Sequence, residues 1–220
     1  MIEIAASILS LDIFSFKDEI ERIKPFIDRF HLDIMDGHFV PPISFGQQFI
    51  KNLRPISDVP FDVHLMITNP EAQVESFLEA GGDIIIVHIE TVSEFSKIKT
   101  FINSYGKKIG LSISPNTSIN KITPYLEEID VLLIMTVYPG YSGQKFIEES
   151  INIINKVRKL KQEKSLIFKI MVDGGINYTT ARGVIEAGAE ILVIGTGLFS
   201  SADPVKELEK IRSIYNSTIH

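Results

Sequence analysis

Eight short apolar runs alternate with longer amphipathic segments along the whole chain, and this alternation restricts the possible folds more than any other feature. No run exceeds eight residues, and most are rich in Ile and Val, which is typical of parallel strands buried on both faces. The predicted strands are Ile2–Leu9, Arg29–Met35, Phe61–Met66, Asp83–His88, Lys108–Ile113, Val131–Val137, Leu166–Asp173 and Ile191–Gly195.

The segments between these runs have the apolar spacing and the end signals of helices. Strand–helix alternation implies parallel strands joined by right-handed crossovers. Eight such units use the whole chain, whereas a flavodoxin-like open sheet would use only five or six strands. We therefore predict the α/β class and a single (β/α)₈ TIM barrel over residues 1–220. The predicted helices are Phe14–Phe26, Pro70–Ala80, Glu148–Lys161, Asn177–Ala187 and Pro204–Tyr215.

Composition limits the chemistry and the partners. The 220 residues include no cysteine, so a metal would have to be bound by His and carboxylate side chains. The net charge of −6, without a long basic run, argues against nucleic acid or an anionic membrane as a partner. The sequence shows no signal-peptide pattern and no apolar run near the ~18 residues of a membrane span, so we expect a cytoplasmic protein.

Two His and two Asp residues lie at the predicted ends of three strands: His31, Asp33, His64 and Asp173. Alternate strand residues share a face, and catalytic groups of this barrel lie at the carboxyl ends of its strands. Burying such groups is costly unless they are paired or bind a metal. We predict that the four surround one divalent ion, for which zinc, manganese or iron would be suitable. The alternative is a buried polar cluster held together by hydrogen bonds alone.

Glycines follow the last two strands, in Asp173-Gly174-Gly175 and Gly195-Thr196-Gly197. The loops after strands seven and eight of this barrel commonly bind phosphate through backbone N–H groups. After the sixth strand, the segment 139–144 contains Gly140 and Gly143 and is predicted to be a lid that offers the Gly143 N–H to phosphate. The alternative for each segment is an ordinary turn or an exposed loop.

Three of the five methionines, Met35, Met66 and Met135, lie near the predicted strand ends. They are interpreted either as core filler or as an apolar layer that excludes water from the reacting atoms. His38 and His88 are interpreted as structural residues.

These motifs resemble the ribulose-phosphate 3-epimerase family, and the resemblance extends over essentially the whole chain. The most specific stretch is HLDIMDGHFVP at residues 31–41. The remaining stretches that match are Ser7–Ser10, Asp62–Met66, Met135–Val137 with Pro139-Gly140 and Gly143-Gln144, and Val172–Gly175.

The resemblance implies one divalent metal per chain, commonly zinc, with manganese, iron or cobalt also suitable, held by His31, Asp33, His64 and Asp173. It implies that Asp33 and Asp173 also act as the acid and base. The implied reaction converts D-ribulose 5-phosphate to D-xylulose 5-phosphate, in the pentose phosphate pathway, by proton transfer at C3 through an ene-diolate. The implied substrate contacts are Ser7, His64, Met35, Met66, Met135, Gly140, Gly143, Gly174, Gly175, Gly195 and Thr196.

Several positions depart from the family pattern: Pro42, Tyr138, Ser142, Met171 and the segment Gly195–Phe199. Thr196–Phe199 resembles a related branch that converts D-allulose 6-phosphate to D-fructose 6-phosphate, which leaves the substrate's length open. The sequence also leaves open a phosphate-binding barrel of tryptophan or histidine biosynthesis and a non-catalytic barrel. We expect a homo-oligomer that binds a ketose phosphate.

Overall fold

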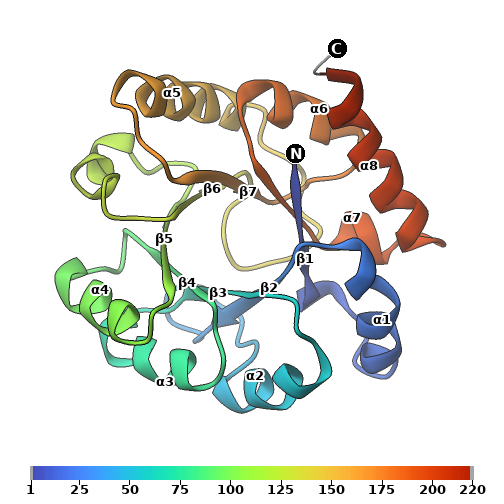
Figure 1. Cartoon of the computed structure of the whole chain (residues 1–220), viewed down its shortest axis with the longest axis horizontal. Helices are drawn as coiled ribbons and strands as arrows, with labels where there is room; N and C mark the ends of the chain where they lie inside the picture. The colour runs from blue at the N-terminus through green and yellow to red at the C-terminus, as the bar shows by residue number, and fades with distance from the viewer. Residues whose placement is uncertain (1, 219–220) are drawn as a thin grey trace.

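Eight parallel strands close into a barrel in sequence order (Figure 1). The last strand, β8, pairs with β1. The computed structural model describes residues 2–218. The predicted α/β class and (β/α)₈ barrel are therefore confirmed. The strands are β1 Glu3–Ser7, β2 Arg29–Met35, β3 Phe61–Met66, β4 Ile84–His88, β5 Lys108–Ile113, β6 Val131–Met135, β7 Lys169–Asp173 and β8 Ile191–Ile194.

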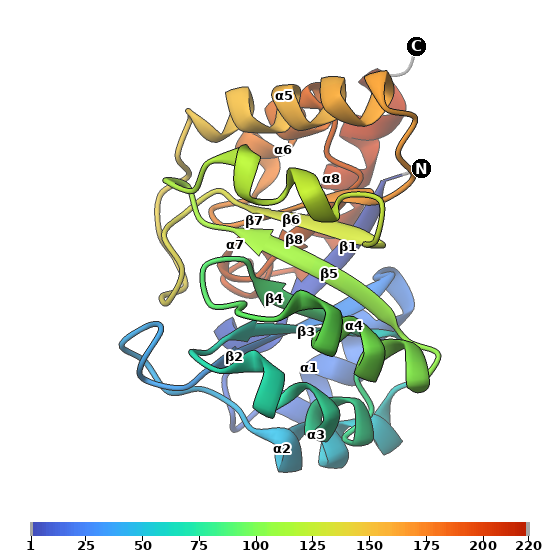
Figure 2. The same ribbon diagram turned by 90° about the vertical axis from the view of Figure 1, so that its left-hand side faces the viewer.

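Helices form an outer layer around the strands, as the two views in Figures 1 and 2 show. The connection from β5 to β6 is the exception: it has two short 3₁₀ helices, η5 Ile119–Lys121 and η6 Thr123–Tyr125, and the second contains Pro124. The α-helices are α1 Phe16–Ile23, α2 Gln47–Leu53, α3 Val74–Glu79, α4 Phe95–Ser104, α5 Ser150–Glu163, α6 Tyr178–Ala187, α7 Thr196–Phe199 and α8 Pro204–Thr218.

Strand boundaries follow the pairing of neighbouring strands more closely than the apolar pattern. The bounds predicted for β2, β3 and β5 are confirmed. The first strand ends at Ser7 and continues into the 3₁₀ helix η1 Ile8–Ser10, which makes it shorter than predicted. The seventh begins at Lys169 instead of Leu166, because Lys169 pairs with Val131, the first residue of β6. Apolar residues before that point have no strand beside them.

Two apolar layers stabilise the barrel. The larger layer lies between the strands and the helices, where it includes Phe30, Phe61 and Phe168. The smaller layer fills the barrel interior, where Met171 is fully buried beside Leu133. Met171, one of the departures from the family pattern, is therefore a packing residue of the barrel interior.

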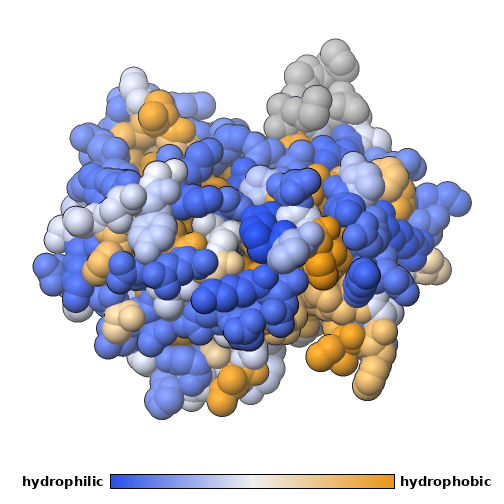
Figure 3. All heavy atoms as spheres, turned by 60° about the horizontal axis from the view of Figure 1, so that its bottom comes forward, coloured by the Kyte–Doolittle hydropathy of each residue, from blue (hydrophilic) through white to orange (hydrophobic). Residues whose placement is uncertain are grey.

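Hydrophilic residues cover most of the face drawn in Figure 3, and hydrophobic side chains form small separate groups on it. No helix within residues 2–218 is both long enough and apolar enough to cross a membrane.

Candidate active site

Strand register brings the predicted acidic and imidazole groups to one end of the barrel. On β2, His31, Asp33 and Met35 alternate along the strand, and β3 places His64 opposite Asp33 and Met66 opposite Met35. Because alternate residues of a strand share a face, every second side chain points to the barrel interior. Asp36, which directly follows β2, instead accepts hydrogen bonds from the backbone of the loop that it begins and from Thr68.

Side-chain atoms of His31, Asp33, His64 and Asp173 converge within 4.8 Å of one another. His31 Nε2 lies 3.3 Å from His64 Nδ1 and 3.4 Å from Asp33 Oδ1, and His64 Nδ1 lies 3.0 Å from Asp33 Oδ1. Asp173 Oδ2 is 3.9 Å from His31 Nε2. Both imidazoles are fully buried. The sequence therefore predicted correctly that these four side chains lie together.

These separations fit a divalent ion. A tetrahedral ion with bonds of about 2.0–2.1 Å holds its ligand atoms about 3.3 Å apart. Two imidazole nitrogens and two carboxylate oxygens are suitable ligands for zinc and for other first-row metals. The facing ring nitrogens of His31 and His64 have room for only one proton between them. Hydrogen bonds alone therefore leave polar atoms of this cluster without partners. His31 Nδ1 is buried without a hydrogen-bond partner among the described residues.

The electrostatics of the metal-free site also favour a cation. Burial would lower the pKa of His31, but the nearby charges of Asp33, Asp173 and Asp62 raise it to about 9. Burial lowers the pKa of His64 to about 3, although Asp33 opposes this effect. Without a metal, the site therefore keeps a proton on His31 beside Asp33, where a metal ion would supply positive charge instead.

The two carboxylates differ in acidity. Burial raises the pKa of Asp33, but the positive charge of His31 and its hydrogen bond to Asp33 outweigh this effect and hold that pKa well below its usual range. Burial and then the negative charge of Asp33 raise the pKa of Asp173 to about 7. Without a metal, Asp33 is therefore the more acidic carboxylate, and Asp173 is the one that holds a proton more readily.

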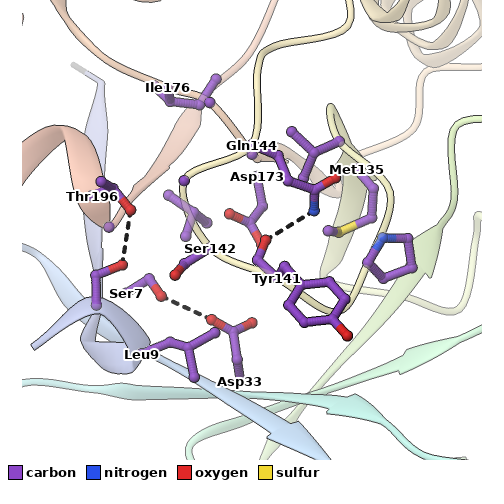
Figure 4. Close-up of a pocket in the computed structure, with 18 of the residues that line it drawn as sticks. Ser7, Leu9, Asp33, Met135, Tyr141, Ser142, Gln144, Asp173, Ile176 and Thr196 are labelled. Atoms are coloured by element: carbon purple, nitrogen blue, oxygen red, sulfur yellow. Dashed lines mark hydrogen bonds between the residues drawn. The ribbon is translucent and has the colours of Figure 1, made fainter. Parts of the chain in front are cut away.

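A cavity of about 250 Å³ opens above this cluster, and Asp33 and Asp173 both face it (Figure 4). Its volume is below the about 300–1,000 Å³ of sites for drug-sized ligands, so it suits a small metabolite. His31 and His64 lie beneath the floor, and the substrate contact predicted for His64 stays a prediction. The remaining predicted substrate contacts all line the cavity: Ser7, Met35, Met66, Met135, Gly140, Gly143, Gly174, Gly175, Gly195 and Thr196.

The glycine loops present backbone donors to this cavity. Gly143 and Gly175 have φ angles of 72° and 66°, in the left-handed region that favours glycine. A Cβ on Gly175 would lie 2.7 Å from the backbone nitrogen of Phe146, so a larger residue does not fit. Within residues 2–218, the N–H groups of Gly143, Gly175 and Thr196 have no protein acceptor.

Sequence reasoning missed part of the cavity wall. The Ser10 hydroxyl lies 3.1 Å from the Thr196 hydroxyl, and this contact joins the loops after β1 and β8. Ser10 lies in Ser7–Ser10, one of the stretches that resemble the family, and this resemblance could have identified it as a site residue. The cavity is also lined by Leu9, Val137, Ile176, Asn177 and Val193. The four apolar residues carry no distinctive chemistry, and the side chain of Asn177 caps the N-terminus of α6.

The segment predicted to be a lid, residues 139–144, lines the cavity. The Gln144 side-chain amide donates to the backbone oxygens of Tyr138 and Tyr141, so it closes the loop on itself. The Tyr138 hydroxyl lies 3.2 Å from Asn116 Oδ1, in the loop after β5. Tyr138, a departure from the family pattern, therefore connects the lid to its neighbouring loop.

A closed parallel barrel with carboxylates and imidazoles facing a cavity at the carboxyl ends of its strands belongs to the class of TIM-barrel enzymes.

Comparison with known proteins gives the family. The ribulose-phosphate 3-epimerase family model matches residues 3–199. A ribulose-phosphate 3-epimerase of Bacillus subtilis is 40% identical over 214 residues, which are 96% of this chain and 99% of that protein. The chloroplastic ribulose-5-phosphate-3-epimerase of Arabidopsis thaliana is 39% identical over 213 residues, 96% of this chain and 76% of that protein. The chain belongs to the ribulose-phosphate 3-epimerase family and is an isomerase that epimerises a carbohydrate.

Solved structures of low sequence identity share the fold. The crystal structure of KGPDC from Streptococcus mutans has a TM-score of 0.74 at 11% identity, with 99% of this chain and 98% of that chain covered. At this identity the likeness concerns the fold alone.

The family match leaves no support for the alternatives that the sequence left open, a phosphate-binding barrel of tryptophan or histidine biosynthesis and a non-catalytic barrel.

Proposed function

We propose that the chain interconverts D-ribulose 5-phosphate and D-xylulose 5-phosphate, with Asp33 and Asp173 as the two proton carriers at C3. The observation that carries the proposal is the placement of these carboxylates on β2 and β7, from which both face one cavity (Figure 4). Epimerisation requires a proton to leave one face of C3 and another to arrive on the opposite face. Two carboxylates on different sides of the barrel meet that requirement.

The surroundings of each carboxylate suit an exchange of roles. Asp33 is fixed by the Ser7 hydroxyl, which donates to Oδ2 at 2.8 Å. An ionised Asp33 can accept the C3 proton while a protonated Asp173 gives one up, and the reverse reaction uses them in the opposite sense. Carboxylates with separated acidities are typical of such acid–base pairs.

We propose that His31, Asp33, His64 and Asp173 hold one divalent metal ion. Zinc is the first candidate, and manganese, iron and cobalt are the alternatives. When bound, the ion would act as a Lewis acid that stabilises negative charge on the substrate's oxygens. The separations of the four side chains and the chemistry of the donor set support this assignment.

We propose that the substrate's phosphate binds at the N–H groups of Gly143, Gly175 and Thr196, because these donors line the cavity without an acceptor among residues 2–218. Met35, Met66 and Met135 line the part of the cavity near the carboxylates. Their apolar side chains would exclude water from the reacting carbon.

The test is to offer purified protein D-ribulose 5-phosphate, D-allulose 6-phosphate and unphosphorylated D-ribulose in deuterated water. We expect turnover of the pentulose phosphate with solvent deuterium incorporated at C3, and at least about 100-fold lower kcat/KM for unphosphorylated ribulose. Preference for D-allulose 6-phosphate would reassign the substrate. Product without solvent deuterium at C3 would contradict the two-carboxylate mechanism.

We further propose that the chain assembles with copies of itself. Ile13, Phe14 and Ile43 are 74%, 96% and 81% exposed, in loops that follow β1 and β2. Large apolar side chains this exposed are typical of surfaces covered by another protein.

A further inference from the structure

His88, at the end of β4, contacts the predicted metal ligand His64 at Nε2, the ring nitrogen that does not face Asp33 and His31. The two Nε2 atoms are 2.9 Å apart, and the rings stack with centroids 4.9 Å apart and an interplanar angle of 25°. His88 is fully buried and also packs against Phe39. His88 does not line the cavity.

Glu90 fixes the other side of the His88 ring. Its Oε2 lies 3.0 Å from His88 Nδ1. Its Oε1 accepts the Ser114 N–H at 2.8 Å and the Thr117 hydroxyl, both from the loop after β5. Burial raises the pKa of Glu90, but the hydrogen bonds from His88, Thr117 and Ser114 outweigh this and lower it to about 2. Glu90 is therefore an acceptor on both oxygens.

These contacts fix where the protons lie. A carboxylate can only accept, so His88 Nδ1 carries a proton that it donates to Glu90. The two Nε2 atoms are 2.9 Å apart, so one of them donates to the other. With Nδ1 as its donor, His88 accepts at Nε2 the proton of His64 Nε2. His64 Nδ1 is left as an unprotonated nitrogen, which can accept the proton of His31 Nε2 at 3.3 Å. Its distance of 3.0 Å from Asp33 Oδ1 is then the separation of two ligand atoms that would share one ion, and not a hydrogen bond.

We propose that Glu90 and His88 are positioning residues that select the tautomer of His64 and so keep its Nδ1 free for the metal ion. The inference rests on the metal site proposed above and extends it to two residues that do not line the cavity. Neighbours that orient an imidazole ligand in this way typically contribute about 10–100-fold to metal affinity.

Two substitutions separate this role from simple packing. In Glu90→Gln, the Ser114 N–H and the Thr117 hydroxyl keep the amide oxygen at the Oε1 position, so the NH₂ group faces His88 Nδ1. His88 must then accept there and donate from Nε2, which places the proton of His64 on Nδ1. In His88→Gln, the amide oxygen still accepts from His64 Nε2, so the direction of the hydrogen bond at His64 is kept.

The experiment measures the zinc dissociation constant of each purified variant by chelator competition. We expect Glu90→Gln to weaken zinc binding by about 10–100-fold, and His88→Gln by less than about fivefold. Glu127→Gln, at an exposed carboxylate on the opposite end of the barrel, is the control for the change in charge. A packing role predicts the reverse order, because Glu90→Gln is nearly isosteric and His88→Gln is not.

The second measurement is the ring-nitrogen tautomer of His64, from long-range ¹H–¹⁵N spectra of the metal-free proteins. We expect an unprotonated Nδ1 in the wild type and in His88→Gln, and a protonated Nδ1 in Glu90→Gln. The same His64 tautomer in wild type and Glu90→Gln would overturn the inference. Absence of zinc binding by the wild type would overturn the proposed metal site instead, and the tautomers would still decide the role of Glu90 and His88.

Discussion

Asp33 and Asp173 face the same cavity, but their neighbours give them opposite tendencies to hold a proton. Ser7 and His31 both favour an ionised Asp33. Asp173 lies mostly buried near that negative charge, which raises its pKa to about 7. At the scale of single residues, the candidate chemistry therefore depends on neighbours more than on the identity of the carboxylates.

Asp173→Asn removes one proton carrier and one charged metal ligand. We expect kcat to fall by at least about 10²–10⁴-fold, the usual size of general acid–base catalysis. The metal content of each preparation is measured alongside, because loss of the proton carrier and loss of the metal would both lower kcat. Asp58→Asn, at an exposed carboxylate, should leave kcat unchanged. An Asp173→Asn enzyme that keeps its metal and turns over within a few-fold of wild type would contradict the assigned role.

At the scale of elements, the loops after β6, β7 and β8 place their glycines where a phosphate would bind. Gly143 has a φ angle of 72°, and a Cβ there would find Thr196 Oγ1 at 3.8 Å as its nearest neighbour. Space is therefore available at Gly143, and the constraint on a larger residue is the backbone conformation. Left-handed backbone costs a non-glycine residue about 1–2 kcal/mol.

Gly143→Ala should raise KM by about tenfold with little change in kcat, because strain of this size would shift the lid away from its substrate-binding conformation. Gly106→Ala is the matched control. Gly106 has a φ angle of 63° with open space around it, and it lies between α4 and β5, far from the cavity. Both variants should be destabilised similarly in urea unfolding. An unchanged KM in Gly143→Ala would show that the lid backbone does not bind substrate.

At the scale of the whole molecule, a buried charge network joins strands from both sides of the barrel at the end opposite the cavity. Arg29 donates to Asp62 Oδ1 at 2.9 Å and to Glu3 Oε2 at 2.5 Å. Lys169 contacts the other oxygen of Glu3. The network links β1, β2, β3 and β7, and Asp62 is fully buried within it. Burial raises the pKa of Asp62, and the positive charge of Arg29 opposes that rise.

Arg29→Met should lower the free energy of unfolding by about 3–5 kcal/mol, because it leaves the buried Asp62 carboxylate without its cation. The double variant Arg29→Met/Asp62→Leu should recover most of that loss, since both charges are then removed together. Urea denaturation of the two variants and the wild type measures the difference. Equal stability of the single variant and the wild type would mean that Asp62 is neutral in the folded protein.

The sequence by itself determined the barrel and which acidic and imidazole side chains lie together at one end of it. Apolar runs of strand length, separated by amphipathic segments, predict parallel strands because buried sheets and helices have different periods. His31 and Asp33 share a face for the same reason. The carboxyl ends of parallel barrel strands meet at one rim, so strand order alone predicts that Asp173 approaches them.

Only the tertiary structure decided which residues support that site. The last residues of the predicted first strand and the first residues of the predicted seventh fall outside the sheet, because the register of the neighbouring strand sets where a strand begins and ends. His88 and Glu90 have no local pattern that marks them as partners of His64. Their contacts with His64, Ser114 and Thr117 join three strands or loops that are distant in sequence. Hydrogen-bond direction and pKa depend on such neighbours, which exist only after the barrel has closed.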